Sequence, residues 1–361
     1  MNKNVRKDNV RKACVCKTSV GKTSVRKVFE KSSVLATLGL ALLSSQVFSA
    51  QFEARIGHLE SAQQPRHQAL LKVASLVDER TSGEVSLQFF PSAQLGNQRQ
   101  MTESTQFGVI QGTVSPAAFL GGFNKVVSVL DIPYLYPTDR ELSTKIRSSE
   151  FGTAILDSFT GLGVKAIALW PNGRKNFTSN KSLDNITDFD GQKFRVMNSK
   201  VLISQFNALG ASALPLPFGE LYTSLQTGVV DGEENPLDTI YRMKFYQVQD
   251  NLVISEHGAM EDIVLFNEAW WNSLPKNYQQ IIVTAFNEAI PALEISKDEA
   301  IEHALAEIKK SDIAIKVLSE EERSQIRDVM YPAAKKAYLS FSGEKGKEIL
   351  SLYEKTYNEL K

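Results

Sequence analysis

The chain has 361 residues, no formal net charge, 42% hydrophobic and 23% charged residues. This balance is typical of a globular protein with one large or two ordinary domains. The charge is unevenly distributed, because residues 1–31 carry ten Lys or Arg against Asp8 and Glu30, which leaves the rest of the chain net negative by eight. A negative remainder would repel phosphate, so the composition argues against a nucleic-acid partner.

Residues 1–50 have the pattern of a secretory signal peptide with a long basic n-region. The basic run precedes SSVLATLGLALLSSQVFSA, whose apolar core of about a dozen residues is too short to span a bilayer and ends in small side chains. We expect cleavage near Ser49 or Ala50 and a periplasmic location. Both cysteines, Cys14 and Cys16, fall in this leader, and a mature chain without thiols suits export to an oxidising compartment.

From residue 52 onward, short apolar runs alternate with amphipathic segments. FEARIG (52–57) and EVSLQFF (84–90) predict strands, and residues 65–80 between them predict a helix, which together make a βαβ unit. Further expected helices are 98–110, two across 138–161, 199–210, 220–228 and 236–246, and further expected strands are 112–119, 164–170, 177–180, 193–196, 251–257 and 262–266. This alternation favours an α/β architecture with a sheet covered on both faces.

The C-terminal part of the sequence has a different pattern. Residues 273–311 hold a helical period for about 35 residues, or roughly 50 Å at 1.5 Å per residue. A helix of this length would most simply extend across two lobes, with a local bend at Pro291. Two more amphipathic helices, about 319–341 and 344–360, are expected to end the chain.

Common enzyme signatures are missing from the sequence. The four histidines, His58, His67, His257 and His303, have no metal-ligand spacing, and no cysteine outside the leader could join them. No Gly-x-Ser-x-Gly motif occurs. GLGVKA (161–166) imitates a dinucleotide fingerprint but precedes a strand where it should follow one. We therefore expect neither a metal ion nor a cofactor.

The run FDGQKFRVMN (189–198) places Arg195 inside a short apolar strand. A guanidinium buried there costs several kcal/mol unless an anion meets it. From the residues alone, that anion is either a protein carboxylate, such as Asp190 or Asp231, or a ligand.

Two other stretches place polar and aromatic side chains near strand ends. WPNGRK (170–175) puts Arg174 and Lys175 in an expected turn after a strand, where they would face a crevice. ALPLPFGELYTSLQTGVVDGEENP (213–236) puts Phe218 on a proline-set turn and Asn235 just past an Asp-Gly. Each has an ordinary alternative: the two basic residues as solvated turn charges, Phe218 as core, and Asn235 as a helix cap before Pro236.

Several of these stretches together resemble a known family. GQKFRVMNS, FNALGASALPLPFGELYTSLQTGVVDGEENPLDTIY, KFYQVQDNL, WNSLPKNYQQII, FPSAQLGNQRQM and LDIPYLY are similar to segments of the substrate-binding proteins of TRAP transporters, the DctP-like family. The resemblance implies an α/β, two-lobed periplasmic-binding-protein fold with a long helix spanning both lobes. It also implies a receptor without catalysis, which closes on a small carboxylate ligand and delivers it to the small and large integral membrane subunits of the transporter.

The resemblance also implies roles for particular residues. Arg195 would make a bidentate salt bridge to the solute carboxylate, Asn235 would assist it, and Phe218 would pack on the solute. Lys175 occupies the position of a second basic residue of the family, whereas Arg174 stands where an apolar residue is common. Which of these two reaches the ligand stays open.

Three further side chains are candidates for contacts to solute hydroxyls from the first lobe: Glu60, Asn97 and Gln98. We expect residues 51–171 and 261–300 to form lobe I and residues 172–260 and 301–361 to form lobe II. A sugar acid and a C4-dicarboxylate are the main candidate solutes. The alternative function is an exported α/β enzyme that acts on an acidic small molecule in the same cleft.

Overall fold

The computed structural model describes residues 50–361, so the expected signal peptide, apart from Ala50, lies outside the described residues. The strands are β1 (Phe52–Gly57), β2 (Val85–Phe90), β3 (Gly112–Pro116), β4 (Val164–Ser179), β5 (Lys193–Val196), β6 (Ser212–Pro215), β7 (Gly232–Pro236), β8 (Asn251–Asn267) and β9 (Ala314–Val317). The helices are α1 (Pro65–Arg80), α2 (Gln98–Gln106), α3 (Arg140–Arg147), α4 (Glu150–Asp157), α5 (Lys200–Ala208), α6 (Leu221–Gln226), α7 (Leu237–Arg242), α8 (Glu268–Ser273), α9 (Lys276–Glu288), α10 (Ile290–Ile308), α11 (Glu320–Phe341) and α12 (Gly343–Leu360).

All of these strands belong to one mixed sheet. Their order is β2-β1-β3-β8-β4-β7-β5-β6, and β9 pairs with β8 beside this path. The pairs β1–β2, β1–β3, β5–β6 and β5–β7 are parallel, whereas β4 runs antiparallel to both β7 and β8. The first βαβ unit and the α/β class expected from the sequence are confirmed.

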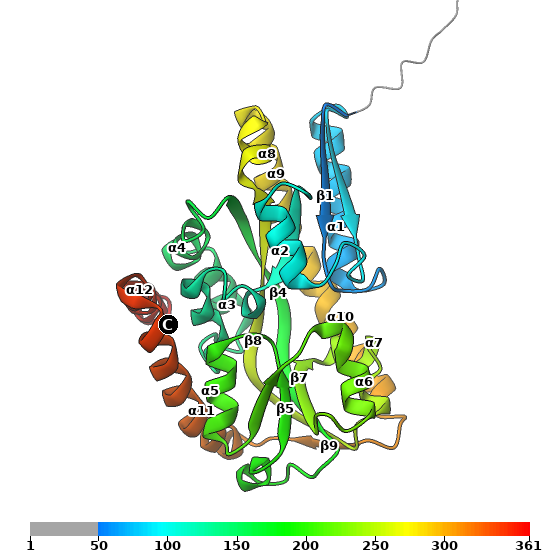
Figure 1. Cartoon of the computed structure of the whole chain (residues 1–361), viewed down its shortest axis with the longest axis vertical. Helices are drawn as coiled ribbons and strands as arrows, with labels where there is room; N and C mark the ends of the chain where they lie inside the picture. The colour runs from blue at the N-terminus through cyan, green and yellow to red at the C-terminus, as the bar shows by residue number, and fades with distance from the viewer. Residues whose placement is uncertain (1–49) are drawn as a thin grey trace, which may run out of the picture. The chain divides into compact units, whose positions relative to one another are not determined.

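Strands β4 and β8 are much longer than expected. Figure 1 shows them running from the upper group of elements, with β1 and α1, to the lower group, with β5 and β7. The sequence analysis placed a turn at residues 171–175 and a break at residues 258–261, and both expectations are wrong. The chain instead absorbs Pro171 and Gly173 as register shifts between β4 and β8, so the strands continue past them.

Each lobe has its own hydrophobic core. In the first lobe, α1 and α9 pack on β1, β2 and one half of β4, around Trp170 and Phe286, whose rings lie 5.4 Å apart. In the second lobe, α5 and β5 pack around Phe177, Phe194 and Phe206, while α6, α7 and the end of α10 form another cluster. Since β4 and β8 belong to both lobes, they connect the two cores directly.

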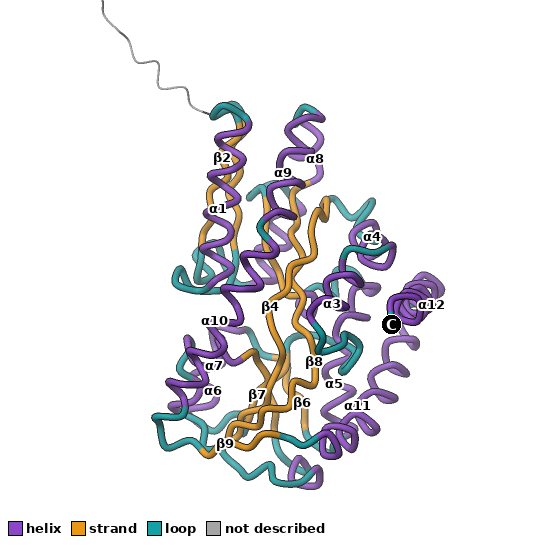
Figure 2. The backbone as a smooth tube through the Cα atoms, turned by 180° about the vertical axis from the view of Figure 1, so that it is seen from behind, coloured by secondary structure: helices purple, strands orange, loops and turns teal. Residues whose placement is uncertain are grey.

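The long helical segment expected at 273–311 is confirmed, with an interruption. Helix α9 ends at Glu288 and α10 begins at Ile290, with Pro291 in its first turn. Helix α10 contacts α1 of the first lobe and α7 of the second, and Figure 2 shows it between them. The segment therefore touches both lobes, as expected.

The C-terminal helices α11 and α12 agree closely with the expected ranges. Helix α11 packs against α5, whereas α12 packs against α3 and α4. Tyr338 and Tyr353 share a buried cluster with Phe151 and Leu130. The lobe boundaries at residues 171/172, 260/261 and 300/301 remain a proposal, and these contacts favour assigning α12 to the first lobe.

Candidate functional site

Arg195 is buried because of its place in β5. Phe194 and Val196 on either side pack into the core of the second lobe, so strand alternation turns Arg195 to the opposite face of the sheet. The Arg195 side chain is 1% exposed, and its Nε and Nη2 atoms donate to the Leu216 carbonyl oxygen at 3.1 and 2.9 Å. The guanidinium is thereby held at the edge of the cavity described below.

No carboxylate within residues 50–361 forms an ion pair with Arg195. Asp231, one of the two alternative partners, instead accepts from the Lys193 backbone and pairs with Lys181. Burial lowers the pKa of Arg195 to about 10, against the raising effect of the more distant carboxylates Glu233 and Glu234. The side chain is thus a buried cation whose charge lacks a direct protein counterion in the described part of the chain.

A small cavity lies against Arg195, and the space between its lining atoms, open solvent included, amounts to about 320 Å³. Its polar lining residues are Glu60, Arg66, Asn172, Arg195, Asn235 and Thr239, and its apolar ones are Leu59, Pro116, Phe119, Met197, Phe218 and Met260. These residues come from both lobes. The cavity thus has the composition of a small-molecule site, with apolar walls and a few converging polar groups.

Two phenylalanines flank the guanidinium in this cavity. The Arg195 Cζ atom lies 5.9 Å from the ring centroid of Phe119 and 5.9 Å from that of Phe218. Phe218 begins a 3-10 turn after Pro217 and packs edge-on against Phe245 at 6.1 Å. Phe119 was not singled out in the sequence, because an aromatic residue after a strand carries no signal of its own.

Asn235 also lines the cavity, at the end of β7. It is 3% exposed, and its side-chain amide donates to the Glu233 carboxylate. It does not cap α7, whose N-cap is Pro236 without a side-chain hydrogen bond. The helix-cap alternative for Asn235 is therefore wrong.

The first lobe contributes an ion-pair network that includes Glu60 and Arg66. Arg66 Nη2 lies 3.0 Å from Glu60 Oε1 and 2.5 Å from Asp262 Oδ2, and Lys297 Nζ lies 3.2 Å from Glu60 Oε1. Asn172 donates to Asp262 and accepts from Lys297 at 3.2 and 3.1 Å. Arg66 was missed in the sequence, where its position in the first turn of an ordinary amphipathic helix gave no sign of a cavity.

Lys175 does not line the cavity. Since β4 continues through this region, Lys175 points into the second lobe, where its Nζ lies 2.8 Å from Glu234 Oε1. Glu234 also accepts from His257 Nε2 at 2.7 Å and Gln205 Nε2 at 3.4 Å. The Lys175 ammonium is the buried counterion of a protein carboxylate, and the structure does not bring it together with Arg195 in the cavity.

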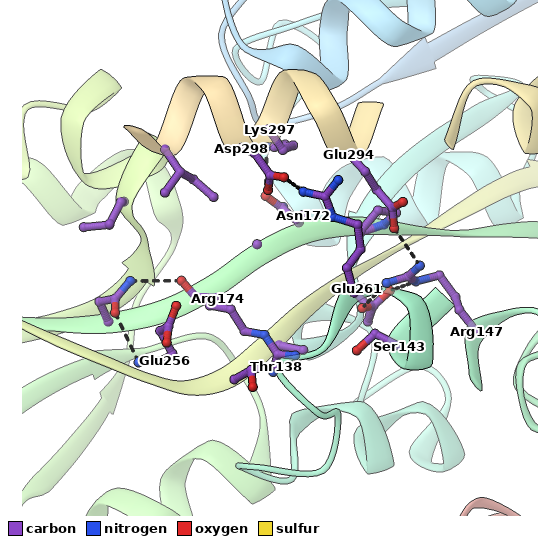
Figure 3. Close-up of a pocket in the computed structure, with 17 residues that line it drawn as sticks. Thr138, Ser143, Arg147, Asn172, Arg174, Glu256, Glu261, Glu294, Lys297 and Asp298 are labelled. Carbon is purple, nitrogen blue, oxygen red and sulfur yellow. Dashed lines mark hydrogen bonds and ion pairs between the residues drawn. The ribbon is translucent and has the colours of Figure 1, made fainter. Parts of the chain in front are cut away.

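Arg174 lies in a different hollow, below α10 (Figure 3). Its Nη1 donates to the Tyr136 carbonyl oxygen at 2.9 Å, and burial lowers its pKa. In the same hollow Arg147 pairs with Glu261 and Glu294 at 2.9 and 3.2 Å. The expected turn at 171–175 would have aimed both basic residues at one crevice, whereas strand alternation sends them to opposite faces.

Asn97 and Gln98 lie in a hollow next to the cavity rather than in it. Asn97 is the N-cap of α2, accepting from the Gln100 amide at 3.0 Å. Gln98 donates to Thr113 Oγ1 at 3.0 Å. Both residues line a neighbouring hollow together with Phe119 and Phe218, so of the three first-lobe candidates only Glu60 reaches the cavity beside Arg195.

Two lobes joined by continuous strands, with a polar-edged cavity lined from both sides, define the class of two-lobed periplasmic solute receptors. The chain belongs to the bacterial extracellular solute-binding proteins of family 7 (DctP), which it matches over residues 56–340. The C4-dicarboxylate-binding periplasmic protein DctP of Shewanella loihica is 30% identical over 329 residues, which cover 90% of this chain and 94% of that protein.

Solved structures with the same fold are receptors of TRAP transporters. A TRAP periplasmic solute-binding protein from Desulfovibrio salexigens with bound orotic acid has a TM-score of 0.85 and 61% identity, covering 86% of this chain and 100% of that one. One from Sulfurospirillum deleyianum with bound succinate has a TM-score of 0.77 and 28% identity, covering 84% and 99%. The expected family and receptor class are thereby confirmed, and the exported-enzyme alternative is not favoured.

The periplasmic names of these relatives support the expected periplasmic location. Among the residues that the structure describes, no helix is both long and apolar enough to cross a bilayer.

Proposed function

We propose that this TRAP-transporter receptor binds a small planar carboxylate of the orotate type, holding its carboxylate on Arg195. The observation that carries the proposal is the buried guanidinium of Arg195, which has no ion-pair partner among residues 50–361. An unpaired buried charge costs several kcal/mol, so an anionic solute that enters the cavity removes a large penalty. Charge-assisted hydrogen bonds formed there strengthen as the lobes exclude water.

Orotate ranks first because of the similarity to the Desulfovibrio salexigens receptor, which is 61% identical and was solved with orotic acid. The Shewanella loihica and Sulfurospirillum deleyianum relatives are named with C4-dicarboxylates or succinate at about half that identity. The walls formed by Phe119, Phe218, Met197 and Met260 suit a flat ring better than a heavily hydroxylated chain. In this assignment Phe218 packs on the ring and Asn235 assists Arg195.

We also propose the partners and the export route expected from the sequence. The loaded receptor would deliver its solute to the small and large integral membrane subunits of a TRAP transporter. The leader would be cleaved near Ser49 or Ala50, since its apolar core followed by small side chains is typical of a secretory signal. Mass spectrometry of the exported protein would locate the cleavage site.

The test is a binding titration of the purified chain from residue 51 onward with orotate, succinate, galacturonate and orotamide. We expect orotate to bind with micromolar or tighter affinity, about 8–12 kcal/mol, and to raise the midpoint of thermal unfolding. Orotamide, which lacks the negative charge, should do neither. Equal binding of the acid and its amide would contradict the proposal.

Substitution of Arg195 gives the matched comparison. Arg195→Lys keeps the charge but removes the planar fork, so orotate should bind at least about 10-fold more weakly. Arg174→Lys is the control and should leave orotate binding unchanged. Arg174 is a half-buried arginine that lies in the separate hollow below α10 and donates to a protein carbonyl oxygen. If folded Arg195→Lys protein bound orotate as tightly as the unmodified protein, Arg195 would not be the residue that holds the carboxylate.

A further inference from the structure

Three polar atoms on the first-lobe side of the cavity have no hydrogen-bond partner within residues 50–361. They are Nε and Nη1 of Arg66 and Oε2 of Glu60, and all three are buried. The two side chains are 1% and 7% exposed and are joined through Arg66 Nη2 and Glu60 Oε1 at 3.0 Å. Both line the same cavity as Arg195.

Orphaned atoms of this kind are rare in folded proteins, since a buried donor or acceptor without a partner is costly. Here, three of them occur in one ion pair at the wall of a cavity. The remaining atoms of the pair are well satisfied, because Asp262 and Lys297 approach Arg66 Nη2 and Glu60 Oε1 at 2.5 and 3.2 Å. The unpaired side of the cluster is therefore the side left for a ligand.

The charge states of the two groups decide what can bind there. Burial acts to raise the pKa of Glu60, but the charges of Arg66 and Lys297 outweigh burial, and the pKa lies below its ordinary value. Glu60 is thus a carboxylate that only accepts hydrogen bonds, and a guanidinium only donates them. A complementary ligand needs a hydrogen-bond acceptor directly beside a donor.

A second carboxylate does not meet this requirement. It would offer acceptors to Arg66 but would also place a negative charge against the free oxygen of Glu60, and such like-charge contacts oppose binding. A ring imide meets it, because its N–H lies between two carbonyl oxygens. The N–H would donate to Glu60 and a carbonyl would accept from Arg66.

We propose that Glu60 and Arg66 recognise the neutral imide edge of a ring whose carboxylate is held by Arg195, and that Glu60 excludes C4-dicarboxylates. This inference rests on the proposed function and deepens it. It assigns the two lobes different tasks, with the second lobe binding the anion and the first lobe selecting the uncharged end.

The first experiment uses the unmodified protein and compares four acids by calorimetry: orotate, 3-methylorotate, benzoate and succinate. 3-Methylorotate lacks the imide N–H, benzoate lacks the whole edge, and succinate replaces it with a second carboxylate. We expect each of the three to bind at least about 100-fold more weakly than orotate, as sites built to hydrogen-bond a polar group reject analogues without it. Binding of 3-methylorotate or benzoate within threefold of orotate would overturn the inference, as would tighter binding of succinate than of orotate.

The second experiment separates the hydrogen bond from the bulk of the methyl group. Glu60→Gln is isosteric and removes the charge, so orotate affinity should fall by about 10-fold or more while the already weak affinity for 3-methylorotate changes little. Succinate affinity should rise, because the opposing charge is gone. Glu103→Gln, on the exposed face of α2, is the control and should change neither. Equal losses for both orotates in Glu60→Gln would contradict the inference.

The two proposals fail in different ways. If orotate and benzoate bind equally well and both depend on Arg195, the imide inference falls while the carboxylate receptor stands. If no carboxylate binds the unmodified protein, the proposed function itself falls. Should Glu60→Gln fail to fold, the analogue series on the unmodified protein still decides.

Discussion

Arg195 and Glu233 are paired in register on the neighbouring parallel strands β5 and β7, yet no ion pair joins them among the described residues. The Glu233 carboxylate instead accepts from Asn235 and, at 2.9 Å, from Thr178 Oγ1. Burial raises the pKa of Glu233 to about 7, in spite of these hydrogen bonds and of Arg195. Near neutral pH, much of the population thus carries a neutral Glu233, which leaves Arg195 available to a ligand anion.

This raised pKa predicts a specific pH dependence of stability. The folded protein holds the Glu233 proton more tightly than the unfolded chain, so the stabilisation is complete below about pH 4.5 and is lost as the pH rises through about 7. Glu233→Gln mimics the neutral form. Between pH 5 and pH 8, its unfolding free energy should therefore fall by roughly 2–3 kcal/mol less than that of the unmodified protein. Urea unfolding at both pH values measures the difference.

Asp131 and Asp262, whose pKa values burial raises to about 7 and about 6, titrate in the same range in both proteins and cancel in this comparison. Parallel pH profiles for the two proteins would show that Glu233 titrates at its ordinary pKa.

Lys175 should matter for stability rather than for binding. Its ammonium and the Glu234 carboxylate are 2% and 0% exposed, and removing one partner of such a pair costs about 3–5 kcal/mol. Lys175→Met should therefore lower the unfolding free energy by that amount while leaving the orotate dissociation constant within about threefold. Lys145→Met, at an exposed ion pair with Glu141, should lower it by less than about 1 kcal/mol. If Lys175→Met were as stable as the unmodified protein but no longer bound orotate, Lys175 would have to be assigned to the solute site.

Phe218 should contribute to solute affinity through its ring. It lines the cavity and lies beside the Arg195 guanidinium, so Phe218→Ala removes apolar contact and admits water next to the charge. We expect orotate to bind about 10- to 100-fold more weakly, or roughly 1.4–2.8 kcal/mol. Phe107→Ala is the control, because Phe107 is 78% exposed. Equal calorimetric affinities for the Phe218 variant and the unmodified protein would place its ring outside the contact surface.

Gly173 allows β4 to continue from one lobe into the other next to Pro236. Its φ of +148° is rarely adopted by other residues, and a Cβ atom there would lie 3.0 Å from Pro236 Cβ. Gly173→Ala should lower the unfolding free energy by about 1–3 kcal/mol. Gly161→Ala, with φ of +81° and open space around its Cβ, is the comparison in the same denaturation assay for a positive-φ glycine whose Cβ meets no neighbour. A Gly173→Ala protein as stable as the unmodified protein would contradict the prediction.

The order of helices and strands was predictable because hydrophobic periodicity is local. The helix at 65–80 is found at the expected residues, and the two C-terminal helices differ by two residues or fewer. The breaks predicted in β4 and β8 were wrong because Pro and Gly usually end strands. Here the pairing of two long antiparallel strands tolerates them as register shifts, and pairing partners about 90 residues apart cannot be identified from local pattern.

The candidate site, too, was predictable from the sequence only in part. A lone arginine in the apolar strand FRV singled out Arg195 in the sequence, although Asp190 and Asp231 remained alternative partners for its charge. Lys175 looked equally available, but its carboxylate partner is 59 residues away in the chain.

The sequence by itself indicated the alternation of elements, the family and Arg195 as a candidate for anion binding, since each depends on residues close together in the chain. Only the tertiary structure decided which charges are already paired and which remain open. It brought Glu60 and Arg66 to the cavity beside Arg195, with three of their atoms left without a partner among residues 50–361, because burial and ion pairing depend on contacts between residues distant in sequence.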